Sequence, residues 1–177
     1  MDVDPHDRFA IAVSADLRKS SHIWKIDLNE EAAPILLVTV PSKLISLAIA
    51  ANKVIFCDDQ GRLWDCETSE SGHMRKIGQI DYATKSLACT DDTEIILTGS
   101  AHGISVWTNG TELTLASYVA TEGLRAIKIA RMQTESGQNV VVTASTSQGL
   151  TKWLLYSGEA GLKSQSDHAP KFGPWPV

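Results

Sequence analysis

Short apolar runs alternate with polar turns along most of the chain. The runs are rich in Val, Ile and Thr, and Gly, Asp, Asn or Ser residues bound them. Branched apolar residues between such turn residues are typical of β-strands. The pattern therefore predicts an all-β protein without a long helix.

One phrase recurs four times, and it consists of an apolar strand, a polar turn and a second strand that ends in Trp. The copies run from Phe9 to Trp24, from Val54 to Trp64, from Ile95 to Trp107 and from Val140 to Trp153. Their Trp residues are separated by 40, 43 and 46 residues. A steady period of this size indicates a repeat protein with one supersecondary unit per period.

Two further strands fit around most copies of the phrase. A strand is expected before three copies, at Leu44–Ile49, Ser86–Cys89 and Leu124–Ala130, and after three copies, at Ile35–Val40, Arg75–Ile80 and Leu113–Tyr118. Four strands per period without a helix are the content of a β-propeller blade.

The repeated phrase resembles the WD40 repeat, in which the Trp ends the third strand of each blade. Trp64-Asp65 keeps the dipeptide that gives this repeat its name, whereas Lys25, Thr108 and Leu154 follow the other three Trp residues. The Gly-His pair that precedes a WD40 blade is missing. The resemblance therefore implies a WD40-like propeller without the family's Asp-His-Ser-Trp hydrogen-bond network.

The repeated Trp residues are expected to be structural. In a propeller, a large flat side chain near the end of strand three fills the gap between neighbouring sheets and buries roughly 150–250 Å². We therefore assign a core-packing role, and not a ligand cage, to Trp24, Trp64, Trp107 and Trp153.

The ends of the chain predict an arc and not a full ring. Met1–Arg8 reads as a loop, so the first blade is expected to lack its inner strand, and no full outer strand is obvious after Tyr156. We expect about 3.5–4 four-stranded blades over residues 1–156, followed by a flexible or docking tail over residues 157–177. A self-contained four-blade ring is the alternative.

An incomplete arc has consequences for partners. Each end exposes an apolar sheet face, and such faces and bare strand edges mark partner binding or aggregation. We expect other protein chains as partners, either one that completes the propeller or a second copy in a homodimer.

Composition narrows the function classes. The chain has 177 residues, of which 43% are hydrophobic and 21% charged, and its net charge of -5 argues against direct binding of nucleic acid. Its apolar runs are too short to cross a bilayer. Cys57, Cys66 and Cys89 are an odd number within apolar runs, which favours free thiols in the cytoplasm or nucleus.

The sequence contains no catalytic or metal-binding constellation. Its five His residues have no metal-ligand spacing, and neither a nucleophile elbow nor a phosphate-cradling glycine loop is present. The segment Asp58-Asp59-Gln60-Gly61 reads as a tight turn in which Gly61 has a positive φ, and not as a calcium loop. No enzymatic activity, cofactor or metal is expected.

Two regions are candidates for binding a partner. By resemblance to WD40 propellers, the turns between strands two and three lie on a peptide-binding face, and an equally good reading is that they are merely solvated. A tail that ends in aromatic residues and prolines could dock in an extended form. The candidate residues are Arg18, Lys19, Gln60, His102 and Gln148 on the turns, and Phe172 and Trp175 in the tail.

The leading prediction is a non-catalytic protein–protein interaction scaffold, a subunit of a multi-protein complex. One alternative is a small-molecule-binding or catalytic propeller, which would need convergent polar side chains along the central channel. A second is an RCC1-like regulatory propeller, because Gly61-Arg62-Leu63-Trp64 is similar to part of that repeat.

Overall fold

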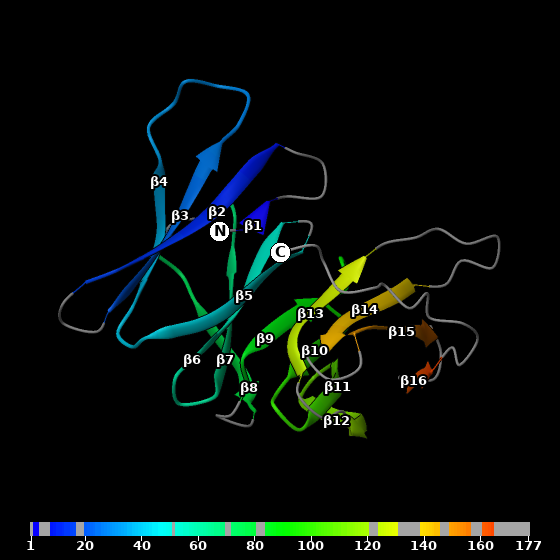
Figure 1. Ribbon diagram of the computed structural model, residues 1–177. Helices are drawn as coiled ribbons and strands as arrows, with labels where there is room; N and C mark the ends of the chain where they lie inside the picture. Colours follow the sequence, from blue (N-terminus) through cyan, green and yellow to red (C-terminus); the bar gives the residue numbers. More distant parts are fainter. Residues whose placement is uncertain are drawn as a thin grey trace.

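The computed structural model describes residues 2–3, 8–16, 20–50, 52–69, 72–80, 84–120, 124–130, 139–145, 149–156 and 161–164, and their side chains between residues 8 and 120. These residues form β-strands and turns without any helix (Figure 1). None of these described ranges could therefore cross a membrane as a helix. The all-β prediction is confirmed.

The strands form four antiparallel sheets of four strands each, and the strand order in every sheet follows the chain. The first sheet contains β1 (Asp2–Val3), β2 (Phe9–Ala15), β3 (Ser21–Asp27) and β4 (Ile35–Val40). The second contains β5 (Leu44–Ala50), β6 (Lys53–Asp58), β7 (Arg62–Glu67) and β8 (Arg75–Gln79). The third contains β9 (Ser86–Cys89), β10 (Ile95–Gly99), β11 (Gly103–Asn109) and β12 (Leu113–Ala120). The fourth contains β13 (Leu124–Ala130), β14 (Asn139–Ser145), β15 (Gly149–Tyr156) and β16 (Gly161–Ser164).

Both terminal sheets have a strand that the sequence pattern did not reveal. The segment read as an N-terminal loop contains β1, in which Asp2 pairs with Ile11 and Val3 with Ala10. The outer strand that was not obvious is β16, which pairs with β15 and lies inside the range expected to be a tail. Each of these strands contains a single apolar residue apart from Gly, Val3 in β1 and Leu162 in β16, so neither shows a run of apolar positions.

The four sheets follow one another along an open arc (Figure 1). Consecutive sheets pack most closely near their inner strands, where β5 contacts β1 and β9, and β9 contacts β13. Within the described residues, the first and fourth sheets do not pack in this way. The prediction of an incomplete propeller arc is confirmed.

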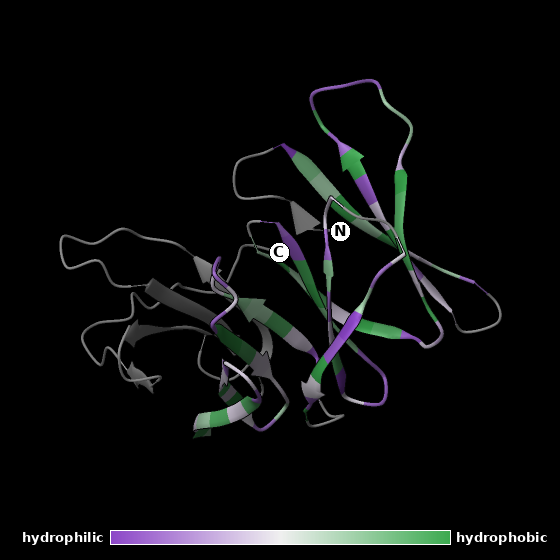
Figure 2. Cartoon of the chain, turned by 180° about the vertical axis from the view of Figure 1, so that it is seen from behind, coloured by the Kyte–Doolittle hydropathy of each residue, from purple (hydrophilic) through white to green (hydrophobic). Residues whose placement is uncertain are grey.

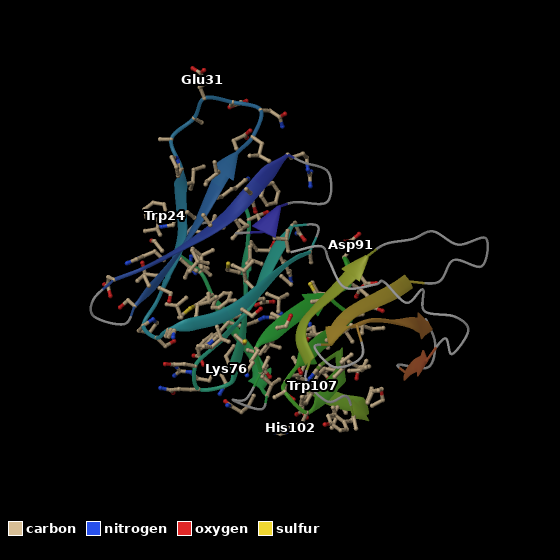
Figure 3. All side chains as sticks on the ribbon, viewed as in Figure 1. Trp24, Glu31, Lys76, Asp91, His102 and Trp107 are labelled. Carbon is tan, nitrogen blue, oxygen red and sulfur yellow. The ribbon has the colours of Figure 1, made fainter. Side chains whose placement is uncertain are left out.

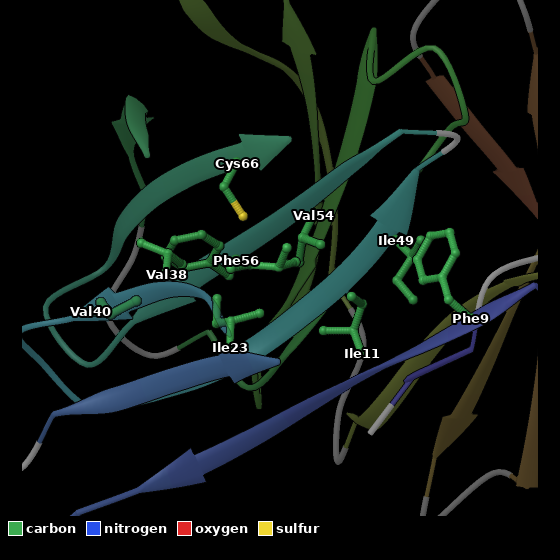
Figure 4. Close-up of a cluster of buried hydrophobic side chains, with 10 residues drawn as sticks. Phe9, Ile11, Ile23, Val38, Val40, Ile49, Val54, Phe56 and Cys66 are labelled. Atoms are coloured by element: carbon green, nitrogen blue, oxygen red, sulfur yellow. The ribbon is translucent and has the colours of Figure 1, made fainter. Parts of the chain in front are cut away.

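The core lies between the faces of neighbouring sheets. Figure 2 shows hydrophobic residues gathered along the strands and hydrophilic ones at many of the turns. Between the first two sheets, Ile11 and Ile23 lie in one buried cluster with Val54 and Phe56 (Figure 4). A second cluster includes Leu63 from the second sheet and Ile96 from the third. The sheets are therefore held together by apolar side chains that interdigitate across each interface.

A register shift recurs where each described Trp meets the outer strand. The pairing slips by one residue at Trp24, at Trp64 and at Trp107, so that β4, β8 and β12 each contain a bulge. A bulge bends its strand and increases the local twist. The repeat in the sequence therefore corresponds to a repeat in detailed backbone geometry.

Removing Phe56 tests the packing between the first two sheets. Its side chain is fully buried, so Phe56→Ala should lower the free energy of unfolding by about 3–5 kcal/mol. The half-exposed Leu115 of β12 is a control, because Leu115→Ala removes apolar atoms from outside the buried clusters. Equal losses in urea unfolding of the two variants would contradict the proposed interface.

Candidate interaction surfaces

Each described Trp indole donates a hydrogen bond to the neighbouring strand. The Nε1 of Trp24 lies 2.9 Å from Ser14 Oγ, and the Nε1 of Trp107 lies 2.9 Å from Thr98 Oγ1. The Nε1 of Trp64 lies 3.3 Å from Asp58 Oδ2. Each acceptor stands two residues beyond the residue that pairs with the Trp, so one geometry recurs in three sheets.

We call the side of each sheet that carries this Trp its Trp face. Trp64 packs against the buried cluster between the first and second sheets, and Trp107 against the cluster between the second and third. Each of these Trp faces therefore lies on the opposite face of the preceding sheet. The sheets therefore pack in one direction along the chain, and these Trp faces are turned toward the preceding sheet.

In the part of the chain that the structure describes, no sheet covers the Trp face of the first sheet, and in Figure 3 Trp24 lies on the outer side of that sheet. Ser14, the acceptor for Trp24, is exposed, whereas the equivalent Asp58 and Thr98 are only 2% and 4% exposed. Ala12 is partly exposed, whereas the residues in its register position, Phe56 and Ile96, are fully buried.

This uncovered face is apolar and free of formal charge along its strands. By strand alternation and pairing register it comprises Ala12 and Ser14 of β2, His22, Trp24 and Ile26 of β3, and Leu36 of β4, whereas Ala10, which pairs with Ile26, is only 2% exposed. The His22 Nδ1 lies 3.0 Å from Thr39 Oγ1, which gives the face a polar margin. An aromatic, uncharged centre with a polar margin is typical of protein–protein interfaces.

The second sheet contains a network around the buried Asp58 carboxylate. Asp58 accepts hydrogen bonds from Arg62 Nε at 2.6 Å and Ser42 Oγ at 3.1 Å, besides the Trp64 indole and the Gln60 and Arg62 backbone amides. Burial raises the pKa of Asp58, but the hydrogen bonds from Arg62, Gln60 and Trp64 outweigh it and leave this pKa below its usual value.

The Asp58 network differs from the network of the WD40 family. The absence of the Gly-His pair indicated that no Asp-His-Ser-Trp network would form, and the network around Asp58 contains Ser42, Trp64 and Arg62 but no His. It forms because the turn after β6 reverses the chain, so that Arg62, four residues after Asp58, lies beside the Asp58 carboxylate. Gly61 permits that turn with a φ of 73°, which confirms the expected positive φ.

Gln60 and His102 lie on equivalent turns of the second and third sheets, and both are exposed. Their backbone carbonyls accept hydrogen bonds, from Gln79 Nε2 at 2.7 Å and from Tyr118 Oη at 2.8 Å respectively. The turns are therefore anchored while these residues face solvent. The other candidate residues, Arg18, Lys19, Gln148, Phe172 and Trp175, lie outside the described residues, as does the side chain of Trp153.

The described part of the chain offers little for catalysis. It contains no group of three His, Cys, Asp or Glu residues that could hold a metal ion. Burial raises the pKa of Cys57 to about 11 and that of Cys66 to about 12, so both thiols stay protonated at neutral pH.

An open hollow of about 430 Å³ lies along β4. Its lining consists of Leu36, Leu37, Val38, Thr39, Gly72 and Met74. This lining contains no group that titrates near neutral pH. The hollow is therefore an apolar extension of the surface near the outer edge of the first sheet.

No family model and no curated protein matches the sequence. Many solved structures match the fold, among them a functionally unknown protein from Desulfotomaculum acetoxidans DSM 771, with a TM-score of 0.65 and 16% identity over 92% of this chain and 53% of that one. The WD40 β-propeller domain of Doa1 matches with a TM-score of 0.56 and 14% identity, over 86% of this chain and 49% of that one. Kuenenia stuttgartiensis hydrazine synthase matches with a TM-score of 0.58 and 12% identity, over 86% of this chain and 43% of that one.

These likenesses define the class of the protein. Together with the four twisted sheets, they show that the chain has a β-propeller-like fold. The chain spans about half the length of the solved structures that it matches. At these identities the comparisons establish the fold alone.

The indole hydrogen bonds give a test of which Trp faces are covered. Thr98→Val keeps the side-chain shape but removes the acceptor for the Trp107 indole inside a covered interface, which should cost about 1–3 kcal/mol. Ser14→Ala removes the exposed acceptor for Trp24, and because water can replace it the cost should stay under about 0.5 kcal/mol. Urea unfolding measures both, and similar losses would show that the first Trp face is covered in the isolated chain.

The Asp58 network gives a test by pH. Because the folded state holds the pKa of Asp58 below its ordinary value of 3.8, the carboxylate stabilises the fold above that value, and the stabilisation is lost as pH falls through the lowered pKa. Asp58→Asn should reduce stability at neutral pH and remove this component of the acid loss, as measured by urea midpoints between about pH 2 and 7. Asp59→Asn changes the exposed neighbour of Asp58 and should retain this component of the loss of stability in acid. Identical pH profiles for Asp58→Asn and wild type would contradict the network.

Proposed function

We propose that the chain is a non-catalytic, WD40-like scaffold that binds other proteins, and that the Trp face of its first sheet is the principal binding surface. The observation that carries this proposal is the exposure of the Ser14–Trp24 hydrogen bond beside the partly exposed Ala12 and Ile26. In the second and third sheets the equivalent positions Asp58, Phe56, Thr98 and Ile96 are buried beneath a neighbouring sheet.

The chemistry of the face suits a protein partner. Trp24 and Ile26 offer apolar area whose removal from water favours association. His22 and Ser14 offer hydrogen-bonding groups beside that area, which fix the orientation of a partner. Large side chains of this kind carry much of the binding energy in protein interfaces.

The turns at Gln60 and His102 supply a second surface for such a scaffold. Arg62 adds a cation beside them, 5.7 Å from the Trp64 ring centroid and bound to Asp58. Polar side chains at these turns would determine which partner binds to the apolar face. Membership of a multi-protein complex in the cytoplasm or nucleus is part of the same proposal.

Binding of a hydrophobic dye tests the principal surface. In dilute solution the wild-type chain should enhance the fluorescence of anilinonaphthalene sulfonate, because apolar area on the first sheet is open to solvent. Ala12→Glu places a carboxylate at the centre of that area and should reduce the enhancement several-fold. Because Ala12 is already partly exposed, the melting temperature of the Ala12→Glu variant should differ from that of wild type by only a few degrees.

Leu115→Glu is the matched control, since Leu115 pairs with Trp107 as Leu36 pairs with Trp24, but in the third sheet. It should leave most of the dye signal in place. Absence of dye binding by the wild-type chain, or unfolding of the Ala12→Glu variant, would contradict an open Trp face.

A further inference from the structure

The loop between β3 and β4, residues 28–34, adjoins the Trp face of the first sheet, and we call it the acidic loop. We infer that this margin of the Trp face binds a basic, apolar segment of another protein. An apolar side chain of the segment enters the hollow along β4, and its Lys or Arg side chains pair with the acidic loop. The inference rests on the proposed function, because Leu36 belongs to both the Trp face and the hollow.

The acidic loop carries negative charge that no described cation neutralises. Glu30 and Glu31 are exposed, and in the part of the chain that the structure describes neither carboxylate has a hydrogen bond or an ion pair. No Lys or Arg occurs between Ile26 and Ser42. The loop projects beyond the strands in Figure 1, and Glu31 lies at its tip in Figure 3. Both carboxylates are therefore open to a cationic partner.

The cations of the adjoining strand ends lie on the other face of the sheet. Lys25 Nζ lies 4.9 Å from the centre of the Phe9 ring and 3.4 Å from the backbone carbonyl of Thr68. Arg8 Cζ lies 5.9 Å from the centre of the same ring. Phe9 belongs to the buried cluster between the first and second sheets, so neither cation occupies the Trp face.

Hydrogen bonds fix the base of the acidic loop. Asp27 Oδ1 accepts hydrogen bonds from the backbone amides of Asn29 at 2.8 Å and Glu30 at 3.2 Å. The Arg8 carbonyl accepts one from the Leu28 backbone amide at 3.1 Å and another from Asn29 Nδ2 at 3.4 Å. A loop that is ordered before binding loses less conformational entropy when a partner arrives.

Exposed apolar side chains stand at both ends of the loop. Leu28 is 49% exposed, and Ile35 and Leu36, the first two residues of β4, are 54% and 38% exposed. Leu36 also lines the hollow of about 430 Å³, whose lining carries no charged residue. A partner that fills the hollow removes apolar area from water, and complementary charges beside that area fix its orientation.

The third sheet provides matched controls. Its Leu115 pairs with Trp107 as Leu36 pairs with Trp24, and it is also exposed. Its turns carry two exposed Glu residues, Glu94 between β9 and β10 and Glu112 between β11 and β12.

The test is the binding of fluorescent peptides, measured by anisotropy at low ionic strength. The basic probe is Lys-Lys-Ile-Val-Leu-Lys-Lys, and the acidic probe has Glu in place of every Lys. Wild type should bind the basic probe roughly ten-fold or more tightly than the acidic one, and salt at about 0.5 M should reduce the difference. Equal binding of the two probes would overturn the inference.

Because a net charge of -5 favours a basic probe anywhere on the chain, charge variants locate the site. Glu30→Gln combined with Glu31→Gln should weaken binding of the basic probe roughly three- to ten-fold, since two exposed ion pairs are lost. Glu94→Gln combined with Glu112→Gln removes the same charge elsewhere and should weaken it less than about two-fold. Equal losses in the two double variants would show that binding follows net charge alone, which would overturn the inference.

Apolar variants test the hollow. Leu36→Ala should weaken binding of the basic probe several-fold, whereas Leu115→Ala should leave it unchanged. Thermal unfolding checks that each variant is folded, because substitutions at these exposed positions should shift the melting temperature by only a few degrees. Equal binding by the two folded Leu variants would overturn the assignment of the hollow.

The dye experiment separates this inference from the proposed function. A folded chain that binds the dye through Ala12 and its neighbours but does not bind the basic probe would overturn the inference and leave the scaffold proposal standing with a different partner. A chain that binds neither would contradict both.

Discussion

The packing of a Trp face on the opposite face of the preceding sheet is the interaction on which the rest of the structure depends. It joins a flat aromatic side chain, an indole hydrogen bond and an outer-strand bulge at one point of the second and the third sheet. Apolar burial supplies most of the stabilisation at such an interface, and the buried acceptor keeps the indole N–H satisfied. The same arrangement recurs with different acceptors, Asp58 in one sheet and Thr98 in another, so the geometry is retained while the chemistry varies.

Because this interaction has a direction, an open arc has two unlike ends. The first sheet keeps the Trp, the bulge and the indole hydrogen bond, but among the described residues no sheet lies in front of it. The small, partly exposed Ala12 leaves room beside Trp24. These features support the protein-binding role proposed for the first Trp face.

Much of the fold could be predicted from the sequence, because alternation and turn residues mark strands of ordinary length. Strands were predicted with their observed bounds at Ile35–Val40, Ser86–Cys89 and Leu124–Ala130. The strands β1 and β16 each contain only one apolar residue apart from Gly, so they show no apolar run. The acceptor role of Ser14 and the solvent exposure of one Trp face depend on cross-strand register and on how the sheets pack, and neither is encoded in a local run of residues.

Exchange of the Trp indole protons with solvent, followed by NMR as the protein concentration is raised, tests the central claim most directly. At the lowest concentration, the account predicts fast exchange at Trp24 and slow exchange at Trp64 and Trp107, whose faces are covered within the chain. Equal protection of the three indoles in the most dilute sample would contradict the account.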